Sequence, residues 1–480
     1  MIVLKFGGTS VGSVDRVRDA AKIIDAQPKP RVAVVSAASG VTNLLLDAAR
    51  AAAAREVERS AAHVAAIRAK HLHIAEGIVR APERLGALAD LGQLHAALND
   101  ALEDVADRGE LTPKDSDRIV ATGEKAMSVL MAATLRARGT PAIHLFADNV
   151  IGTDDRFGSA RPDRARTREQ AIANVQPLLD EGKTVVITGF IGGAPDGSTT
   201  TLGRGGSDYS ATLLGAALNA DEVQIWTDVP GVLSADPRQV RDARVVPQVS
   251  YDEAQELAHF GAKVLHPRTI RPAVALDIPV RILSTFAPKE PGTLVTRESA
   301  GQAVKAVTAM KGLMLLNVDV PELEDLAGAA SATFKVLHEH QIEVVLASQG
   351  SSRRRMTYLV DTITGGCPRI QELIEESLDD VEATVSCAGD VAVVAAIGQG
   401  AAEQASEFGR MLGVLERAGI PILAASQQMS NMALVAAVPA RNAERAVDVI
   451  HTAFIRPQPG SARGRRPRRS EMLSESLRVG

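Results

Sequence analysis

The stretch Lys5–Gly12 reads KFGGTSVG and directly follows the apolar run Ile2–Leu4. An apolar run that leads through glycines into a helix start predicts a strand, a loop and a helix, and the N–H groups of such a loop can face an anion. Lys5, on the strand, would add a positive charge. The Walker pattern G-x-x-x-x-G-K-[ST] is absent because the lysine precedes the glycines. Taken alone, the stretch is equally compatible with a phosphate cradle and with a glycine turn beside a surface lysine.

Short apolar runs alternate with helical patterns up to Ser284. Residues 32–37 (VAVVSA) form one such run, as expected for a strand buried on both faces. Residues 13–26 carry apolar side chains at helical spacing. Strands that alternate with helices predict an α/β fold with a mainly parallel central sheet. Further strands are predicted at residues 185–189, 223–227 and 280–284.

The composition is that of a globular protein without a polyanionic partner. With 480 residues we expect two or three domains, and 45% hydrophobic and 23% charged residues are ordinary values. The formal net charge of −5 gives no reason to expect nucleic acid binding. The two cysteines, Cys367 and Cys387, cannot supply a disulfide framework and favour a reducing compartment. No signal peptide or membrane span is indicated, so we expect a cytoplasmic protein.

An internal repeat follows the loop Phe286–Gly292 (FAPKEPG), whose prolines and glycine indicate a domain boundary. Segments 336–349 and 414–427 share residues at equal spacing, and each ends in Ala-Ser-Gln. Each copy predicts a βαββαβ unit. Residues 457–480 are rich in arginine, proline, glycine and serine and predict a disordered basic tail. Its GRRPRR run could contact nucleic acid, but such runs are usually solvated.

A second polar cluster occupies Thr199–Ala211 (TTTLGRGGSDYSA). Its glycines let the backbone approach a ligand closely, and Arg204 can pair a carboxylate through two hydrogen bonds. Asp208 lies near a predicted helix start, where an aspartate can also simply cap the helix. A third cluster, Trp226–Arg238 (WTDVPGVLSADPR), follows a strand, and open α/β sheets bind ligands at the carboxyl ends of their strands.

Three weaker motifs carry further polar side chains. Ser36–Asn43 (SAASGVTN) places hydroxyls after the second predicted strand. Ala121–Ser128 (ATGEKAMS) places Glu124 at a predicted helix start, where a carboxylate can also be a cap. Phe260–Pro267 (FGAKVLHP) places Lys263 near a helix end, where a lysine also favours the helix dipole.

Taken in their order along the chain, from Lys5–Gly12 to Phe260–Pro267, the six motifs resemble the motif series of the aspartate kinases, over residues 1–295. The resemblance implies the amino-acid kinase (carbamate kinase-like) fold, an α/β sandwich with a mainly parallel sheet. The repeat resembles the two ferredoxin-like ACT domains of that family, within a regulatory region at 296–456. One ACT unit is inserted in the other in the family, which places the first at 313–388 and the second at 302–312 plus 389–456.

The implied enzyme, an aspartate kinase, uses ATP and Mg²⁺ to phosphorylate the β-carboxylate of L-aspartate to 4-phospho-L-aspartate. This is the first step towards the amino acids made from aspartate, lysine and threonine among them. A β-carboxylate is already ionised at pH 7, so the transfer needs positioning and charge neutralisation, and no general base.

The resemblance also implies a role for each matching residue. Lys5 would stabilise the transferred phosphoryl group and Asp208 would orient the reacting groups, which makes these two the catalytic residues. Arg204 would pair with the α-carboxylate of aspartate and Glu124 with its ammonium group. The other substrate-binding residues would be Ser36, Thr42 and Ser207, and the ATP-binding residues would be Lys5, Gly7, Gly8, Thr227, Asp228, Arg238 and Lys263. Leu233 stands where some relatives have a tyrosine, which leaves one nucleotide contact open, and no metal ligand is assigned.

The ACT pair implies regulation by an amino acid. In lysine-inhibited relatives an aspartate helps to hold the effector, and Val345 stands at that position here. The segment Val344–Ser352 is more similar to threonine-responsive relatives, so threonine is expected ahead of lysine, with Gln349 and Ser351 as contacts. An enzyme without feedback stays open. ACT pairs in this family associate between subunits, so we expect a homodimer or homotetramer, with neither a membrane nor a nucleic acid partner.

Two other functions are compatible with parts of the pattern. Another amino-acid kinase would share the first motif, but Arg204, Glu124 and the ACT pair argue against it. A catalytically dead amino-acid sensor would be indicated by loss of Lys5 or Asp208, and both are present. A dinucleotide-dependent dehydrogenase is excluded because no G-x-G-x-x-G follows the first strand.

Overall fold

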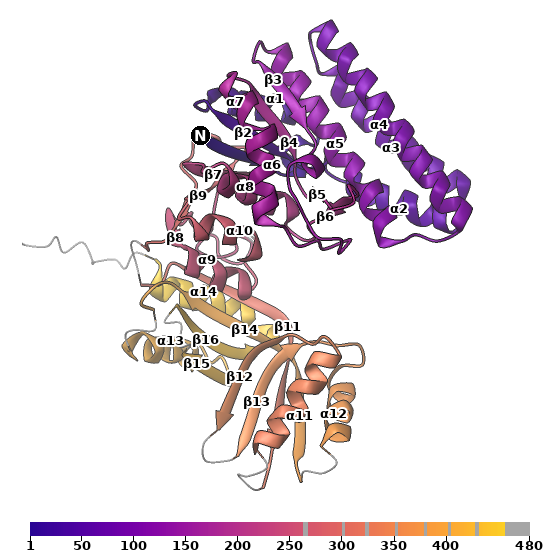
Figure 1. Ribbon diagram of the computed structural model, residues 1–480. Coiled ribbons are helices and arrows are strands. Elements are labelled where there is room, and N and C mark those ends of the chain that lie inside the picture. Colours follow the sequence, from indigo (N-terminus) through magenta and orange to yellow (C-terminus); the bar gives the residue numbers. More distant parts are fainter. Residues whose placement is uncertain are drawn as a thin grey trace, which may run out of the picture.

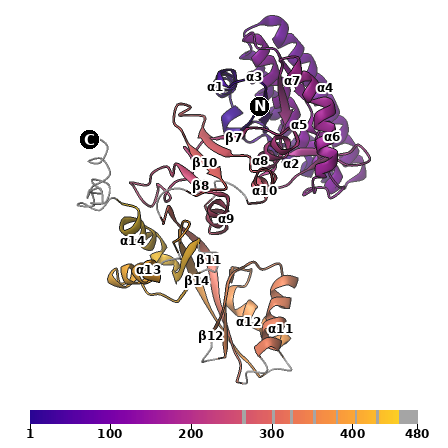
Figure 2. The same cartoon turned by 60° about the vertical axis from the view of Figure 1, so that its left-hand side comes forward.

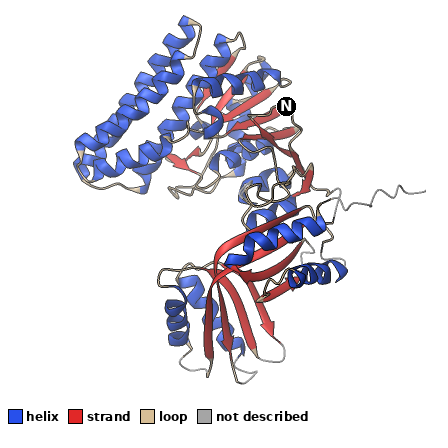
Figure 3. Ribbon diagram, turned by 180° about the vertical axis from the view of Figure 1, so that it is seen from behind, coloured by secondary structure: helices blue, strands red, loops and turns tan. Residues whose placement is uncertain are grey.

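The computed structural model describes residues 1–262, 267–299, 303–321, 326–350, 354–378, 382–401, 405–427 and 432–456. Two large sheets organise it, one in the first part of the chain and one in the last, and helices flank both (Figure 1, Figure 3). The basic tail at 457–480 lies outside the described residues, so its expected disorder stays a prediction. Among the helices of the described residues, none combines the length and apolar character needed to cross a membrane.

The first sheet has eight strands in the order β3-β4-β2-β1-β7-β9-β10-β8. All neighbours from β3 to β9 are parallel, whereas β10 runs antiparallel to β9 and parallel to β8. This arrangement confirms the expected α/β fold with a mainly parallel sheet. The strands are β1 Ile2–Phe6, β2 Arg31–Val35, β3 Ala142–Leu145, β4 Thr184–Thr188, β7 Glu222–Thr227, β8 Gln248–Ser250, β9 Val280–Ser284 and β10 Thr293–Thr296, and β5 Ile191–Gly193 and β6 Thr199–Thr201 form a separate hairpin.

Helices cover both faces of this sheet (Figure 1, Figure 2). Side chains alternate along β1, so that Val3 belongs to one hydrophobic cluster and Leu4 and Phe6 to the other. Helices α1 to α5 pack mainly on the face of Leu4, and α6 to α10 on the face of Val3. The helices are α1 Val14–Ala26, α2 Val41–Ala53, α3 Val57–Glu76, α4 Ala81–Arg108, α5 Pro113–Ala137, α6 Arg164–Asn174, α7 Gln176–Asp180, α8 Gly206–Ala217, α9 Tyr251–His259 and α10 Pro267–Ala275.

The loop Phe286–Gly292 does not separate domains, contrary to its sequence-based interpretation. It joins β9 to β10, which pair antiparallel within one sheet. Prolines and glycines interrupt regular structure equally well in a linker and in a turn inside a domain. The composition of the loop therefore could not distinguish the two.

The second sheet has the order β12-β13-β11-β14-β16-β15. Its strands are the red arrows in the lower part of Figure 3. Its long central strands, β11 and β14, pair antiparallel over their whole length, with an irregular register between Lys311 and Leu315. One hydrophobic core lies on each side of this irregularity along the strands. The elements are β11 Ala306–Asp319, α11 Leu326–Glu339, β12 Val344–Gly350, β13 Arg355–Asp361, α12 Gly366–Ser377, β14 Thr384–Ile397, α13 Ala405–Arg417, β15 Ala424–Gln427, β16 Ala433–Pro439 and α14 Ala443–Phe454.

Cys367 at the start of α12 and Cys387 on β14 are joined by a disulfide. The low cysteine count gave no reason to expect this bond, and it stands against the reducing compartment that the count favoured. The pair forms because α12 packs on β14, which brings together two residues that are 20 apart in sequence. Pairing through packing of this kind cannot be deduced from the cysteine count.

Candidate active site

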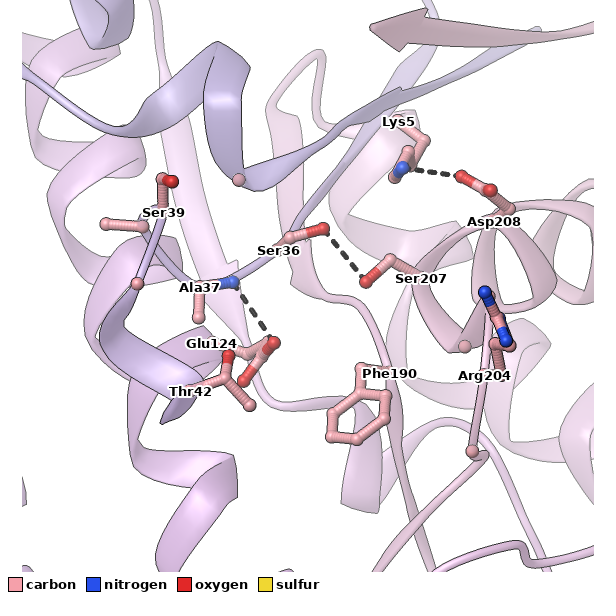
Figure 4. A pocket seen from close by; sticks show the side chains of 16 residues that line it. Lys5, Ser36, Ala37, Ser39, Thr42, Glu124, Phe190, Arg204, Ser207 and Asp208 are labelled. Carbon is pink, nitrogen blue, oxygen red and sulfur yellow. Dashed lines mark hydrogen bonds and ion pairs between the residues drawn. The ribbon is translucent and has the colours of Figure 1, made fainter. Parts of the chain in front are cut away.

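A pocket of about 530 Å³ lies where β1 and β2 end and α8 begins (Figure 4). The carboxyl ends of adjacent parallel strands meet at one edge of the sheet, which is where such sheets bind ligands. All seven residues that the sequence indicated for catalysis and substrate binding line this pocket. They are Lys5, Ser36, Thr42, Glu124, Arg204, Ser207 and Asp208.

Lys5 and Asp208 form an ion pair, with 2.5 Å between Nζ and Oδ1. Both side chains are mostly buried, because they are 11% and 19% exposed. Lys5 points in from β1 and Asp208 from the first turn of α8 (Figure 4). A fixed positive charge therefore lies at the start of a helix, whose free N–H groups also favour an anion.

The glycines of the first motif allow close packing around Lys5. A Cβ on Gly8 would lie 2.8 Å from the carbonyl oxygen of Ala37, closer than real contacts allow. A Cβ on Gly7 would lie 3.4 Å from Nζ of Lys5. The loop continues into a short 3₁₀ helix, Gly8–Val11, as expected for a strand, loop and helix unit.

Glu124 lies in the middle of α5, and not at a helix start as the sequence suggested. The helix begins earlier, with a capping box formed by Thr112 and Asp115. Glu124 is 3% exposed, and its Oε1 accepts a hydrogen bond from the N–H of Ala37 at 3.1 Å. Its Oε2 is buried without a hydrogen-bond partner among the described residues. Burial raises the pKa of Glu124 to about 8, because desolvation disfavours the charged carboxylate.

The remaining pocket residues offer hydrogen bonds and one more positive charge. The hydroxyl of Ser36 donates to that of Ser207 at 2.9 Å, so these side chains link β2 to α8. Thr42 lies in the first turn of α2. Arg204 is exposed and stands between Gly203 and Gly205, whose φ angles of 74° and 71° favour glycine. These two glycines shape the loop that carries Arg204 into the pocket.

The predicted nucleotide residues lie partly beside this pocket. Thr227 ends β7, the neighbour of β1, and its hydroxyl donates to Asp228 at 3.2 Å. The N–H of Gly7 donates to the carbonyl of Trp226 at 3.3 Å, so the first loop borders this strand end. Arg238 is 88% exposed and ion-paired with Asp236 at 2.6 Å. The structure thus brings Thr227 and Asp228 next to the glycine loop, and leaves Arg238 on the surface.

Two predicted residues lie outside the described part of the chain, namely Lys263 and Ser351. Gln349, the other expected effector contact, is exposed on β12, which is an edge strand of the second sheet. Val345 is buried on the same strand. Leu233 forms a bridge with Val245, in the loop that follows β7.

Sequence reasoning missed Phe190, which also lines the pocket. It has a φ of 70°, which is unusual for a side chain with a Cβ. Its N–H donates to Ser210 of α8 at 3.0 Å, and its carbonyl accepts from the N–H of Leu202 at 2.8 Å. A single phenylalanine between Gly189 and Ile191 carries no pattern that indicates this position. Lys70 of α3, also missed, donates to the carbonyl of Ser39 at the pocket rim.

The site can therefore hold a small zwitterion beside a phosphate. Glu124 offers a buried carboxylate oxygen, Arg204 a planar cation, and Lys5 a positive charge (Figure 4). Lys5 also lies beside the glycine loop, next to Gly7. These are the groups that carboxylate, ammonium and phosphoryl ligands require.

Comparison with known proteins gives a family match for each part of the chain. Residues 1–284 match the amino acid kinase family, and residues 394–454 match an ACT domain. Lysine-sensitive aspartokinase 3 of Escherichia coli (strain K12) is 34% identical over 464 residues, covering 94% of this chain and 98% of that protein.

Solved structures agree with this relationship. The crystal structure of E. coli aspartokinase III in complex with aspartate and ADP (R-state) is 33% identical, with a TM-score of 0.78. The same enzyme in complex with lysine and aspartate (T-state) is 34% identical, also with a TM-score of 0.78. Each alignment covers 95% of this chain and 100% of the other. The chain belongs to the aspartate kinases of the amino acid kinase family.

Proposed function

We propose that this chain transfers the γ-phosphoryl group of ATP to the β-carboxylate of L-aspartate, giving ADP and 4-phospho-L-aspartate. The observation that carries the proposal is the Lys5–Asp208 ion pair in one pocket with Glu124 and Arg204. The family relationship supports it, because an E. coli relative has been solved with aspartate and ADP.

The acceptor side would recognise both charged groups of the amino acid backbone. The unpartnered Oε2 of Glu124 would accept hydrogen bonds from the α-ammonium group, and Arg204 would pair with the α-carboxylate. Ser36, Thr42 and Ser207 would complete the pocket with hydroxyl groups. The β-carboxylate would then face Lys5, ionised and ready to attack.

The donor side would use charge neutralisation and no general base. Lys5 would stabilise the transferring phosphoryl group, while Asp208 orients the lysine through their ion pair. The N–H groups of the glycine loop would bind phosphate oxygens. Thr227 and Asp228, at the end of β7, would lie against the nucleotide, with Arg238 and Lys263 as further contacts.

The pocket fits an Mg²⁺ ion whose ligands come mainly from the phosphates of ATP. Within the described residues, no group of three or more His, Cys, Asp or Glu side chains could hold a metal ion by itself. Mg²⁺ requires only one or two carboxylates when phosphates supply its other ligands. Asp208 is the carboxylate that faces the phosphoryl side of the pocket and would hold it. The ion would supply charge neutralisation on the phosphates.

The domain division is part of the proposal, with a kinase domain at 1–295 and a regulatory region at 296–456. The first ACT unit would span about 313–388, inserted in a second unit formed by 302–312 and 389–456. The irregular pairing near Gly312 supports this division, because residues after it also pair with β13. So do the two separate cores.

We also propose feedback by an amino acid, with lysine now ahead of threonine. The E. coli relative is named lysine-sensitive and has been solved with lysine. The buried Val345, where lysine-inhibited relatives have an aspartate, still favours threonine. We further propose that the ACT units associate between subunits, so that the protein is a homodimer or homotetramer. We also propose a cytoplasmic location, where ATP and aspartate are available.

Release of ADP with different acceptors tests the substrate. Aspartate should support turnover, whereas glutamate and a blank without acceptor should not. Equal rates with glutamate would exclude aspartate specificity. Repeating the assay with lysine and with threonine identifies the effector, since only one of the two should inhibit.

A further inference from the structure

A second hollow, of about 630 Å³, is lined by five arginines and by no acidic residue. This concentration of positive charge contrasts with the net charge of −5 of the whole chain. It lies between the segment before α6, the start of α8 and the start of α10. The lining residues are Arg156, Phe157, Ser159, Arg161, Pro162, Arg164, Tyr209, Arg268 and Arg271.

The α10 side of this arginine hollow is built from ordered contacts. Arg268 and Arg271 are one turn apart on α10, so their side chains share a face. The guanidinium of Arg268 lies 5.5 Å from the ring centroid of Tyr209. It also donates to Ser159 Oγ at 3.5 Å and to the carbonyl of Ala160 at 3.4 Å. These contacts hold one guanidinium plane at the wall of the hollow.

Two nearby carboxylates already have partners, and the partner of Asp154 is Arg156, which itself lines the hollow. Asp154 pairs with Arg156 at 3.4 Å and accepts the backbone N–H groups of Arg156 and Arg161. Asp163 caps α6 by accepting the N–H groups of Ala165 and Arg166. Within the described residues, no ion pair joins Arg161, Arg164 or Arg271 to a carboxylate. Three guanidinium groups therefore face the hollow without a protein counter-charge.

We propose that the arginine hollow binds a small compound with two or more linked phosphate groups. Guanidinium groups match phosphate oxygens with paired, charge-assisted hydrogen bonds. Several such groups around one concave site favour a multiply charged anion, since each adds attraction and the anion relieves their mutual repulsion. Free polyphosphate and the polyphosphate part of a nucleotide share this chemistry.

The arginine hollow is distinct from the active site but adjacent to it. Neither Lys5 nor Glu124 lines it, whereas Tyr209 directly follows Asp208 in α8. A Cβ on Gly203, in the loop of Arg204, would lie 3.3 Å from Ser159 Oγ at the hollow. An experiment must therefore count the bound equivalents in the wild type and in a variant of the hollow, so that binding at the active site is not taken for binding in the hollow.

Calorimetry on the full chain, saturated with aspartate, tests the proposal with tripolyphosphate as the probe. The wild type should bind one equivalent in the hollow in addition to any bound at the active site, with affinity that falls as salt rises. The double variant Arg161→Gln/Arg271→Gln should bind about tenfold or more weakly, because two charge-assisted pairs are lost. Arg168→Gln is the matched control, since Arg168 is exposed on α6 and does not line the hollow. Its affinity should equal that of the wild type.

The proposal is overturned if the wild type binds no more equivalents of tripolyphosphate than the double variant does, or if the double variant binds it as well as the control does. It is also overturned if a mixed-sequence DNA oligonucleotide displaces the probe at lower phosphate concentration, which would assign the hollow to nucleic acid. The same titration with a non-hydrolysable ATP analogue distinguishes a nucleotide from free polyphosphate as the ligand of the hollow. Tighter binding than tripolyphosphate identifies a nucleotide, and weaker binding identifies free polyphosphate. All variants replace exposed side chains, and circular dichroism verifies that they fold.

Discussion

His451 of α14 and Ser234 of the kinase part form a buried hydrogen bond, with 2.9 Å between Nε2 and Oγ. Ser234 lies in the loop that follows β7, and its carbonyl accepts the N–H of Val307 on β11 at 2.8 Å. Ala235 and Val240 of the same loop belong to the hydrophobic core of the second ACT unit. The loop that leaves the proposed nucleotide side is therefore built into the regulatory part.

Replacing His451 by leucine should weaken ATP binding more than aspartate binding. The loss removes one of the two hydrogen bonds of the buried Ser234 hydroxyl, which keeps only the N–H of Arg244 as a partner, and this costs about 1–3 kcal/mol of folding free energy. Because the loop begins beside Asp228, we expect KM for ATP to rise several-fold and KM for aspartate to stay constant. Steady-state kinetics measures both, with His340→Leu, at an exposed position, as the control. An equal rise in both KM values would contradict a role for this contact on the nucleotide side.

Glu124 should make aspartate capture depend on pH. Its pKa of about 8 lies above the usual carboxyl value, so the ionised form that attracts an ammonium group dominates only above pH 8. We expect kcat/KM for aspartate to rise about tenfold per pH unit below 8 and to level off above it, as this ratio reports the free enzyme. The Glu124→Gln variant should not show this rise with pH. Its kcat/KM should also be about 100-fold lower, because the substrate loses a buried charge partner. A flat profile in the wild type would refute the assignment.

The elements that position Lys5, Ser36 and Asp208 were predictable, because each residue follows an apolar strand or begins a helix next to glycines. The environment of Glu124 was not, since an alanine-rich helix gives no sign of which turn faces the pocket. Phe190 was missed because its position depends on the backbone turn that joins β4 to β5. The disulfide depends on packing between α12 and β14. In each case a tertiary contact decided the outcome, and local sequence does not encode it.

Removing the charge of Lys5 should strongly slow the transfer while leaving aspartate binding largely intact. Lys5→Met takes away a preorganised cation from the transferring group, and losses of about 100- to 1,000-fold in kcat are typical for such groups. The aspartate contacts of Arg204 and Glu124 remain, so KM for aspartate should change little. Lys22→Met, on the exposed side of α1, is the control. Near-normal turnover of Lys5→Met would rule out the catalytic role.

The disulfide between Cys367 and Cys387 should stabilise the first ACT unit alone. It closes a loop of 20 residues, for which chain entropy predicts about 3 kcal/mol. Reduction with dithiothreitol, or Cys367→Ser, should therefore increase hydrogen exchange in α12 and β14 and leave α1 to α5 unchanged. If reduction changes nothing in α12, the bond does not form in solution. Mass spectrometry after alkylation measures its occupancy in the cell, which also tests the cytoplasmic location.

The buried histidine pair on α3 and α4 should make stability fall in mild acid. His71 is 0% exposed, and its Nδ1 lies 3.0 Å from Nε2 of His95. Burial first, and then the nearby His95 and Lys70, lower the pKa of His71 to about 3. The unfolded chain takes up a proton as pH falls below about 6.5, whereas the folded protein does not until pH approaches 3. Stability is therefore full above 6.5 and lost progressively below it.

Between pH 7 and pH 5, His71 alone should remove about 2 kcal/mol of unfolding free energy, and the lowered pKa of His95 acts in the same direction. Urea unfolding at both pH values measures the difference. His71→Met should reduce it by that amount, since methionine does not titrate. His73→Met, two residues further along α3 and at a position that is 69% exposed, should leave the difference unchanged. The same pH dependence in His71→Met as in the wild type would show that His71 is protonated, or accessible to protons, in the folded protein.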